Sequence, residues 1–455
     1  MNLNYSNSIN FIKEMAAGVF FALIVFFPMV VKAQGIPVKK ERRVITSHPH
    51  QSYKGGFQGA IQLFAGYDSN LTYGSDKLDP NGDGQNNIYE KAIPALSLRL
   101  APSVKWVTPQ LHKRSEASTK LQYGIELGGI FRQPYETTTP NGAYNDLRVA
   151  GFLKGVLFYK PSRHFRLQIY EEMNRYSEPH YLLNKDYTQS WIQNSVGAYM
   201  TVIPGDGLLD FVLNYNMDFN YFEQEELNSA NRVAHTFGFR TQYRFLPQSF
   251  IWFAANYNIY QYLENSESRN SMPIKLYGGL STPLWLKFAL TVGGGYGFAL
   301  SGTMPQTWLA MANLTYSLSS KYKIGLGYNH DYSDSLIGSY NDTHNFYLLG
   351  IMPFTPKILL QGKLGYRLEN NYDIYYGYTT DNPTSRTDNI FFLQLMASYK
   401  INKNFAARLS YNFMMDKTPY TATSSINPDP TINTAIDNDP SFMKHEVYLS
   451  ISYFF

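Results

Sequence analysis

The sequence predicts an all-β fold, a single up-and-down antiparallel transmembrane β-barrel of about 18 strands (about 16 to 18), on the strength of three observations. Apolar and polar residues alternate with period two from about residue 57 onward. Most alternating segments are longer than the usual strand of about five or six residues and reach the about 9–11 residues that a tilted membrane strand needs. The connections alternate between tight turns and long polar loops.

The alternation is clearest around residues 208–222. Leu209, Phe211 and Leu213 share one face there, while Asp210 and Asn214 share the other. Because successive side chains of a strand point to opposite faces, such a segment is apolar on one side and polar on the other. We expect strands near 57–67, 92–107, 118–132, 145–160, 164–176, 189–203, 208–222, 232–246, 250–262, 272–282, 286–301, 306–318, 321–333, 342–353, 357–370, 386–400, 403–416 and 442–455.

The connections favour a membrane barrel over a soluble β-sandwich, which is the alternative for such a strand series. Short turns lie at 160–163, 204–207, 246–249, 282–285, 319–320, 353–356 and 401–402. Longer polar loops such as 68–91 and 416–441 lie between them and are rich in acidic residues. Tight turns at one rim and long loops at the other are typical of transmembrane barrels. We therefore expect short periplasmic turns and long extracellular loops.

Composition excludes several classes of protein. Of the 455 residues, 16 % are charged and 16 % aromatic, whereas an ordinary domain is about 25 % charged. The absence of cysteine excludes a disulfide scaffold and a cysteine-ligated metal site. Residues 1–55 hold seven of the 39 basic residues and two of the 35 acidic ones, so the rest of the chain is nearly neutral. No nucleic-acid partner is expected.

The N-terminus has the features of an export signal. An apolar run, Met15–Val31, follows Lys13 and precedes Ala33, a small residue suited to signal-peptidase cleavage. The run is at the short limit for spanning a bilayer and contains Pro28, which disfavours the alternative of an uncleaved anchor helix. We predict a signal peptide at 1–33, a flexible periplasmic tether at 34–55 and the barrel at 56–455.

The C-terminus alternates up to a terminal phenylalanine. Val447, Leu449, Ile451, Tyr453 and Phe455 share one face of the last predicted strand. This pattern resembles the closing-strand signal of bacterial outer-membrane barrels. The resemblance implies a location in the bacterial outer membrane, with membrane lipid and the barrel-insertion machinery as partners.

The first predicted strand ends in the sequence G-Y-D-S-N, Gly66–Asn70. It resembles the opening strand of several outer-membrane barrel families, including porins encoded near polysaccharide-export genes and barrels that help surface lipoproteins across the membrane. These five residues support the barrel class and no particular cargo. The Ala33-Gln34 cleavage site is similar to those of exported Bacteroidota proteins. Residues 34–55 are too few for the periplasmic helical-repeat domain that export barrels often carry.

A barrel of about eighteen strands is wide enough to enclose water, unlike one of eight. Charged residues of both signs fall on the predicted inner face, where they would line the lumen: Lys120, Glu126, Asp210, Asp218, Arg240, Arg244, Lys363 and Arg367. We expect a porin-like channel for hydrophilic solutes or saccharides. The alternative is a surface-exposed binding or assembly barrel, an adhesin or an accessory of secretion or polysaccharide export, whose interior charges pair and leave no open channel.

Aromatic residues are expected where the lipid ends. Trp106, Trp252 and Trp285 fall near the turn ends of predicted strands, and Trp191 and Trp308 near loop ends. Aromatic girdles at both membrane interfaces are typical of transmembrane barrels. We therefore predict that all five tryptophans face the membrane interfaces.

One loop has the spacing of a calcium site. Residues 79–90 match D-x-N-x-D-G-x-x-N-x-x-E and resemble the calcium loop of EF-hand and dockerin repeats, with Asp79, Asn81, Asp83, Gln85, Asn87 and Glu90 as the implied ligands. Pro80, a missing apolar residue at loop position 8 and the lack of flanking helices depart from that pattern. The alternative is an Asn-, Asp- and Gly-rich surface turn.

No catalytic residues are predicted, and we expect the protein not to be an enzyme. The nine histidines are scattered, and neither H-E-x-x-H nor G-x-S-x-G occurs. His330 and His344, each next to or near an aspartate, are the nearest approach to a catalytic pair. An outer-membrane enzyme is thus the least favoured function.

Overall fold

In a computed structural model of the chain, the structure describes 56–73, 92–108, 121–137, 145–177, 190–224, 228, 230–263, 269–285, 287–302, 304–319, 322–335, 337–373, 385–418, 422–424, 436–438 and 441–455. The predicted signal peptide, the tether and the calcium loop at 79–90 lie outside these residues.

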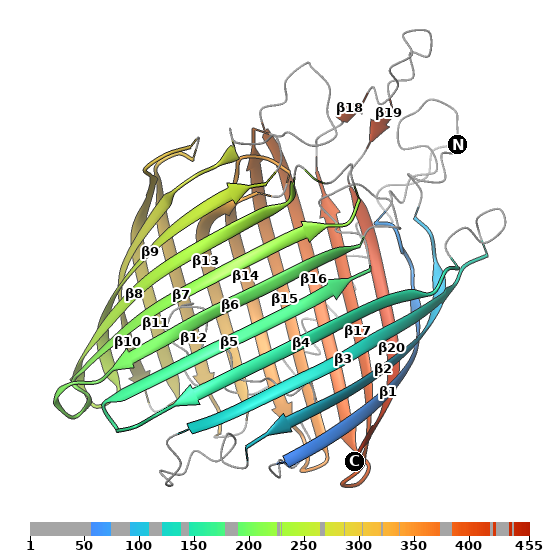
Figure 1. Cartoon of the computed structure of the whole chain (residues 1–455), viewed down its shortest axis with the longest axis horizontal. Helices are drawn as coiled ribbons and strands as arrows, with labels where there is room; N and C mark the ends of the chain where they lie inside the picture. Colours follow the sequence, from blue (N-terminus) through green and yellow to red (C-terminus); the bar gives the residue numbers. More distant parts are fainter. Residues whose placement is uncertain are drawn as a thin grey trace.

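Long strands make up almost all of the described chain (Figure 1). They are β1 (Gly56–Asp68), β2 (Ala95–Val107), β3 (Leu121–Tyr135), β4 (Arg148–Tyr159), β5 (Phe165–Tyr176), β6 (Trp191–Val202), β7 (Leu209–Phe222), β8 (Arg232–Leu246), β9 (Ser249–Tyr262), β10 (Pro273–Trp285), β11 (Phe288–Ala299), β12 (Thr307–Ser317), β13 (Lys323–Asp334), β14 (Tyr340–Pro353), β15 (Ile358–Tyr372), β16 (Ser385–Lys400), β17 (Phe405–Lys417) and β20 (Phe442–Phe454). A short 3-10 turn, Gly205–Gly207, precedes β7.

The strands close into one barrel. Each strand from β1 to β16 pairs antiparallel with the next, β17 pairs with β20, and β20 pairs with β1, so the 18-stranded sheet has no free edge. Closure satisfies the backbone hydrogen bonds of every strand, as crossing a bilayer requires. A separate two-stranded pair, β18 (Ala422–Ser424) and β19 (Ile436–Asn438), lies at the opposite end of the barrel from the C-terminus (Figure 1). The predicted fold class is confirmed.

The outer face of the barrel is apolar. Leu98, Ile125 and Leu449 are each about half exposed although they are hydrophobic, and on nearly every strand the alternate residues that share their face are exposed in the same way. Residues of one strand that are an even number of positions apart share a face, and we say that they have the same parity. The residues of the other parity point inward and include polar ones such as Gln58 and Glu126. An apolar surface that surrounds a closed barrel is the surface that lipid chains cover. Among the described residues, no helix is long and apolar enough to span a membrane.

Three tryptophans follow the predicted girdles, and two do not. Trp106, Trp285 and Trp308 are more than half exposed and lie on the outer face. Trp252 is 2 % exposed and lies inside, against Gly279 and Gly293. Trp191 also faces inward, because it lies two residues from Gln193 on β6, and Gln193 lines an interior pocket. The prediction for Trp191 and Trp252 was therefore wrong, since nearness to a strand end does not determine which face a residue occupies.

Candidate functional site

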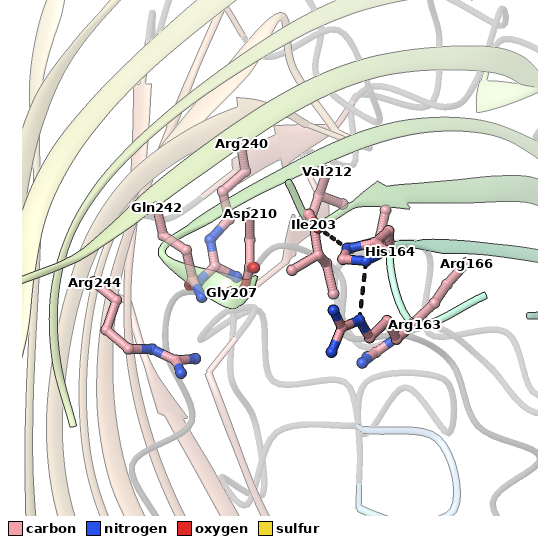
Figure 2. A pocket seen from close by; sticks show the side chains of 11 residues that line it. Arg163, His164, Arg166, Ile203, Gly207, Asp210, Val212, Arg240, Gln242 and Arg244 are labelled. Carbon is pink, nitrogen blue, oxygen red and sulfur yellow. Dashed lines mark hydrogen bonds between the residues drawn. The ribbon is translucent and has the colours of Figure 1, made fainter. Parts of the chain in front are cut away.

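The interior wall formed by β5 to β8 carries a pocket rich in arginine, close to the short turns of these strands (Figure 2). We call it the basic pocket and define it by its charged residues, Arg163, Arg166, Asp210, Arg240 and Arg244. Its volume is about 470 Å³, a size that accommodates a small molecule.

Strand periodicity places these side chains together. Arg240 and Arg244 on β8 are four residues apart and therefore share one face, which Asp210 on the paired strand β7 also faces. Arg163 precedes β5 in a tight turn, and Arg166 is the second residue of that strand. Because β5 to β8 are consecutive neighbours in the sheet, both arginine pairs reach the same space.

The side chain of His164 fixes the orientation of Arg163. Nδ1 of His164 lies 2.8 Å from the carbonyl oxygen of Ile203, to which it donates, so Nε2 is left as an acceptor. Nε of Arg163 donates to that Nε2 at 3.0 Å. The guanidinium group of Arg163 is thus anchored by one edge and has its other nitrogens directed into the pocket (Figure 2).

A second chain of hydrogen bonds fixes Arg240. Its Nη2 donates to Oε1 of Gln242 at 2.6 Å, and Nε2 of Gln242 donates to Oδ2 of Asp210 at 2.6 Å. Gln242 therefore separates the arginine from the aspartate. Asp210 satisfies its charge through an amide rather than through a direct ion pair with Arg240.

A second pocket of about 490 Å³ lies further along the same wall and extends to β13. We call it the amide pocket because asparagines dominate it, among them Asn214, Asn256 and Asn258. Lys275 lies in it with its Nζ 2.8 Å from Oδ1 of Asp331. Side-chain amides both donate and accept, so this pocket suits a solute that carries several hydroxyl groups.

An aromatic stack lies at the loop end of the same strands. The ring of Trp191 stacks on Tyr176 with centroids 4.1 Å apart and on Phe222 at 5.8 Å. These three residues have the same parity as the interior residue Gln193, which lines the amide pocket. The wall thus presents aromatic, amide and guanidinium groups in succession along its strands.

The structure places the predicted lumen-lining residues as follows. Asp210, Arg240 and Arg244 lie in the basic pocket, and Asp218 lies in the amide pocket. Lys363 lies over the ring of Phe392, and Arg367 pairs with Glu369 at 3.2 Å.

Glu126 is 4 % exposed and faces Lys105 and Lys154 across neighbouring strands. Lys120 lies outside the described residues. That these eight side chains line an aqueous lumen stays a prediction.

The strand-closing residues Val447, Leu449, Ile451 and Tyr453 lie on the outer face of β20, and Phe455 directly follows the strand; each of the five is more than a third exposed. The backbone of Phe455 exchanges hydrogen bonds with that of Gly59 at 2.9 and 3.0 Å. This position is compatible with an insertion signal, which stays a prediction. The calcium ligands at 79–90 cannot be located among the described residues.

The motif at Gly66–Asn70 has a structural role that sequence reasoning missed. Asp68 is fully buried inside the barrel, 2.8 Å from Arg132 of β3 and 3.1 Å from Lys444 of β20. Asn70 donates to the carbonyl of Met443 at 3.1 Å. We call Asp68, Arg132 and Lys444 the seam cluster, because it joins the first strand to the last. In the sequence, an aspartate at the end of a strand segment that is otherwise apolar was the signal that could have indicated this role.

The histidines closest to a catalytic arrangement do not face the interior. Nε2 of His330 lies 2.6 Å from Oδ1 of Asp342, and the ring of His330 stacks on His344 with centroids 4.2 Å apart. Their strand parity is that of Leu326 and Phe346, which are exposed on the outer face, and Trp308 covers His330. This trio could gather around a metal ion, but it lies on the lipid-facing surface and away from any interior solute.

The closed barrel, its apolar outer face and its polar interior wall define the class of this protein as an outer-membrane β-barrel. No protein-family model matches the chain, and no curated protein matches it.

Several solved structures are similar to the chain in architecture. Pseudomonas aeruginosa OpdK, solved with vanillate, is 10 % identical, with 88 % of this chain and 99 % of OpdK covered and a TM-score of 0.42. Pseudomonas aeruginosa OccK5 is 10 % identical with a TM-score of 0.42, covering 88 % of this chain and 98 % of its own. The siderophore receptor PirA from Pseudomonas aeruginosa is 9 % identical with a TM-score of 0.41, covering 89 % of this chain and 81 % of its own. At these TM-scores the similarities carry no information about the solute.

Proposed function

We propose that the protein is a porin-like channel that passes hydrophilic solutes, saccharides in particular, across the outer membrane. The observation that carries this proposal is the interior wall of β5 to β8, where the aromatic stack, the amide pocket and the basic pocket follow one another. Aromatic faces stack on sugar rings, and amides and guanidinium groups bond to hydroxyl and acidic groups. A wall of this kind offers successive contacts to a polar solute.

Along the wall of β5 to β8, the interior charges favour an open, hydrated channel rather than a closed, dry interior. At the seam, carboxylates and cations are buried and paired, as in the seam cluster. In the basic pocket, Arg166 and Arg244 form no ion pair with any other described residue. Unbalanced charge is costly to bury in a dry interior and is tolerated in water, so the basic pocket favours a hydrated lumen.

Three further expectations belong to the proposal and rest on the sequence. They are the export signal at 1–33 with the tether at 34–55, recognition of the C-terminal strand by the insertion machinery, and calcium binding at 79–90. A calcium titration of the purified barrel, with Asp83→Asn as the variant, tests the last of these expectations. Equal calcium affinity of the two proteins would contradict it.

Solute flux tests the proposed function. We expect liposomes that contain the purified barrel to swell in isotonic glucose or maltose, and to swell more slowly as the oligosaccharide lengthens. The variant Trp191→Ala removes the aromatic ring on which we expect the sugar to stack, and ring contacts of this kind are worth about 0.5–1.5 kcal/mol. We expect this variant to pass less maltose when the maltose concentration is low. The control, Trp106→Ala, changes an outward tryptophan and leaves flux unchanged. Liposomes with folded barrel that do not swell would contradict the proposal.

A further inference from the structure

The basic pocket holds two arginines, Arg166 and Arg244, whose charges no other described residue neutralises in an ion pair. Nε of Arg166 and Nε of Arg240 are buried and lack a hydrogen-bond partner among the described residues. A buried N–H donor without a hydrogen-bond partner costs free energy, because it has lost its bond to water and gained none in return.

The other members of the pocket are held in place. Arg163 is anchored on His164 at 3.0 Å, and Arg240 is anchored on Gln242 at 2.6 Å. Anchoring one edge of a guanidinium group reduces the rotamer freedom that would be lost on binding. Figure 2 shows Arg163 and Arg244 approaching the pocket from opposite sides, with Arg240 between them.

We propose that the basic pocket is an oxyanion-binding subsite, which takes the carboxylate or phosphate group of an acidic solute. The planar fork of an arginine bonds two oxygens of either group at once. The inference rests on the proposed function and narrows it, because it names the solutes as acidic ones. A general positive field of the turn rim, without a built site, is the competing explanation.

The neighbouring amide pocket indicates what else such a solute carries. Thr236 of the amide pocket and Arg240 of the basic pocket are four residues apart on β8, or roughly 13 Å along the strand. A solute with one acidic group and several hydroxyl groups can contact both pockets. An acidic saccharide has this chemistry.

Calorimetry of the full chain, refolded in detergent at low salt, tests the subsite without requiring conduction. Glucuronate, glucose 6-phosphate and glucose share a sugar ring and differ in the acidic group. We expect glucuronate, glucose 6-phosphate or both to bind about tenfold or more tightly than glucose, since hydrogen bonds to charged groups are the strong ones. Preference for one of the two acids identifies the oxyanion as carboxylate or phosphate. Equal binding of all three would overturn the proposal.

Paired variants separate a built site from a general field. In the double variant Arg166→Gln, Arg244→Gln we expect the acidic sugar to bind about tenfold or more weakly. The control is Arg408→Gln, an interior arginine near the start of β17 and outside the pocket, and we expect its binding to be unchanged. Equal weakening in both would overturn the proposal in favour of the general field.

Two further results keep the interpretation unambiguous. If the double variant does not fold, Arg166→Lys, Arg244→Lys keeps both charges and removes both forks, and is expected to weaken binding. Unchanged binding in that folded variant would overturn the proposal. A barrel that binds the acidic sugar without conducting contradicts the channel alone, whereas one that conducts without preferring the acidic sugar contradicts the subsite alone.

Discussion

Trp252 lies inside the barrel because two neighbouring strands present glycines to its indole ring. A Cβ atom added at Gly279 or Gly293 would overlap the ring. Gly278, which has the opposite parity, would place its Cβ 3.9 Å from the nearest atom, an ordinary contact. The two adjacent glycines therefore differ in the space around them, although the sequence presents them alike.

This difference predicts the effect of a methyl group at each position. Gly279→Ala should crowd both the indole of Trp252 and the carbonyl oxygen of Val292, and it should destabilise the barrel by about 1–3 kcal/mol, as overpacking does. Gly278→Ala should change stability little. The measurements are urea unfolding in detergent and the fluorescence spectrum of the tryptophans. Equal destabilisation by both changes would show that the space around the two glycines does not differ.

The alternation of residues along each strand predicted the correct face for most residues, whereas the expectation of aromatic girdles put Trp191 and Trp252 on the wrong face. Trp252 has the parity of Ala254, which is buried, and the opposite parity to Ile251 and Phe253, which are exposed. Position near a strand end is the same for both faces, so it cannot distinguish them. The alternation within β9 contained the correct assignment.

At the scale of the elements, the pairing of β1 with β20 closes the barrel. Asp68 holds Arg132 at 2.8 Å and Lys444 at 3.1 Å, and all three are almost fully buried. Removing the shared carboxylate breaks two buried ion pairs and leaves Lys444 with its longer contact to Glu446 at 3.8 Å. Breaking a buried pair costs about 3–5 kcal/mol. We expect Asp68→Asn to lower the temperature at which the folded form is lost on a heat-modifiable gel.

The control for this change is an exposed ion pair. Arg175 and Glu223 form a two-bonded contact at 2.7 and 2.8 Å, but both are about a third exposed. Surface pairs are worth about 0–1 kcal/mol, so Glu223→Gln should have little effect. If the two variants lose the same stability, burial does not give the seam cluster its importance.

The last strand allows its folding role to be separated from its proposed signal role. The hydrogen bonds of Phe455 to Gly59 use the backbone and survive Phe455→Ala. We expect this variant to refold in detergent almost as well as the parent but to accumulate less in the outer membrane of cells. Normal levels in cells would argue against an insertion signal at this residue.

At the scale of the whole molecule, the eighteen predicted segments correspond to the eighteen barrel strands. Their number and order follow from long period-two alternation, which a membrane barrel requires of every strand. The boundaries differ by a few residues in either direction: β4, Arg148–Tyr159, is shorter than the predicted 145–160, and β3 ends at Tyr135, past the predicted 132. Alternation of side chains does not mark the residue at which the ladder of hydrogen bonds begins or ends. The short pair β18 and β19 was not predicted, since three residues are too few for a periodic pattern.

The interior site was predictable only in part. Parity put Arg240 and Arg244 on the inner face, but it could not show that they meet Arg163 and Arg166 from a strand more than 60 residues earlier in the chain. That meeting depends on the register between four strands. Nor could parity show that Gln242 separates Arg240 from Asp210, since that depends on side-chain rotamers.

Single-channel recording in a planar bilayer tests the central claim, that this barrel encloses a water-filled path. We expect the purified, folded protein to give stepwise conductance, with ion selectivity shifted toward cations by Arg240→Glu or Lys363→Glu. The gel shift on heating confirms that each protein is folded before it is added. A folded barrel that inserts into the bilayer and never conducts would contradict the account.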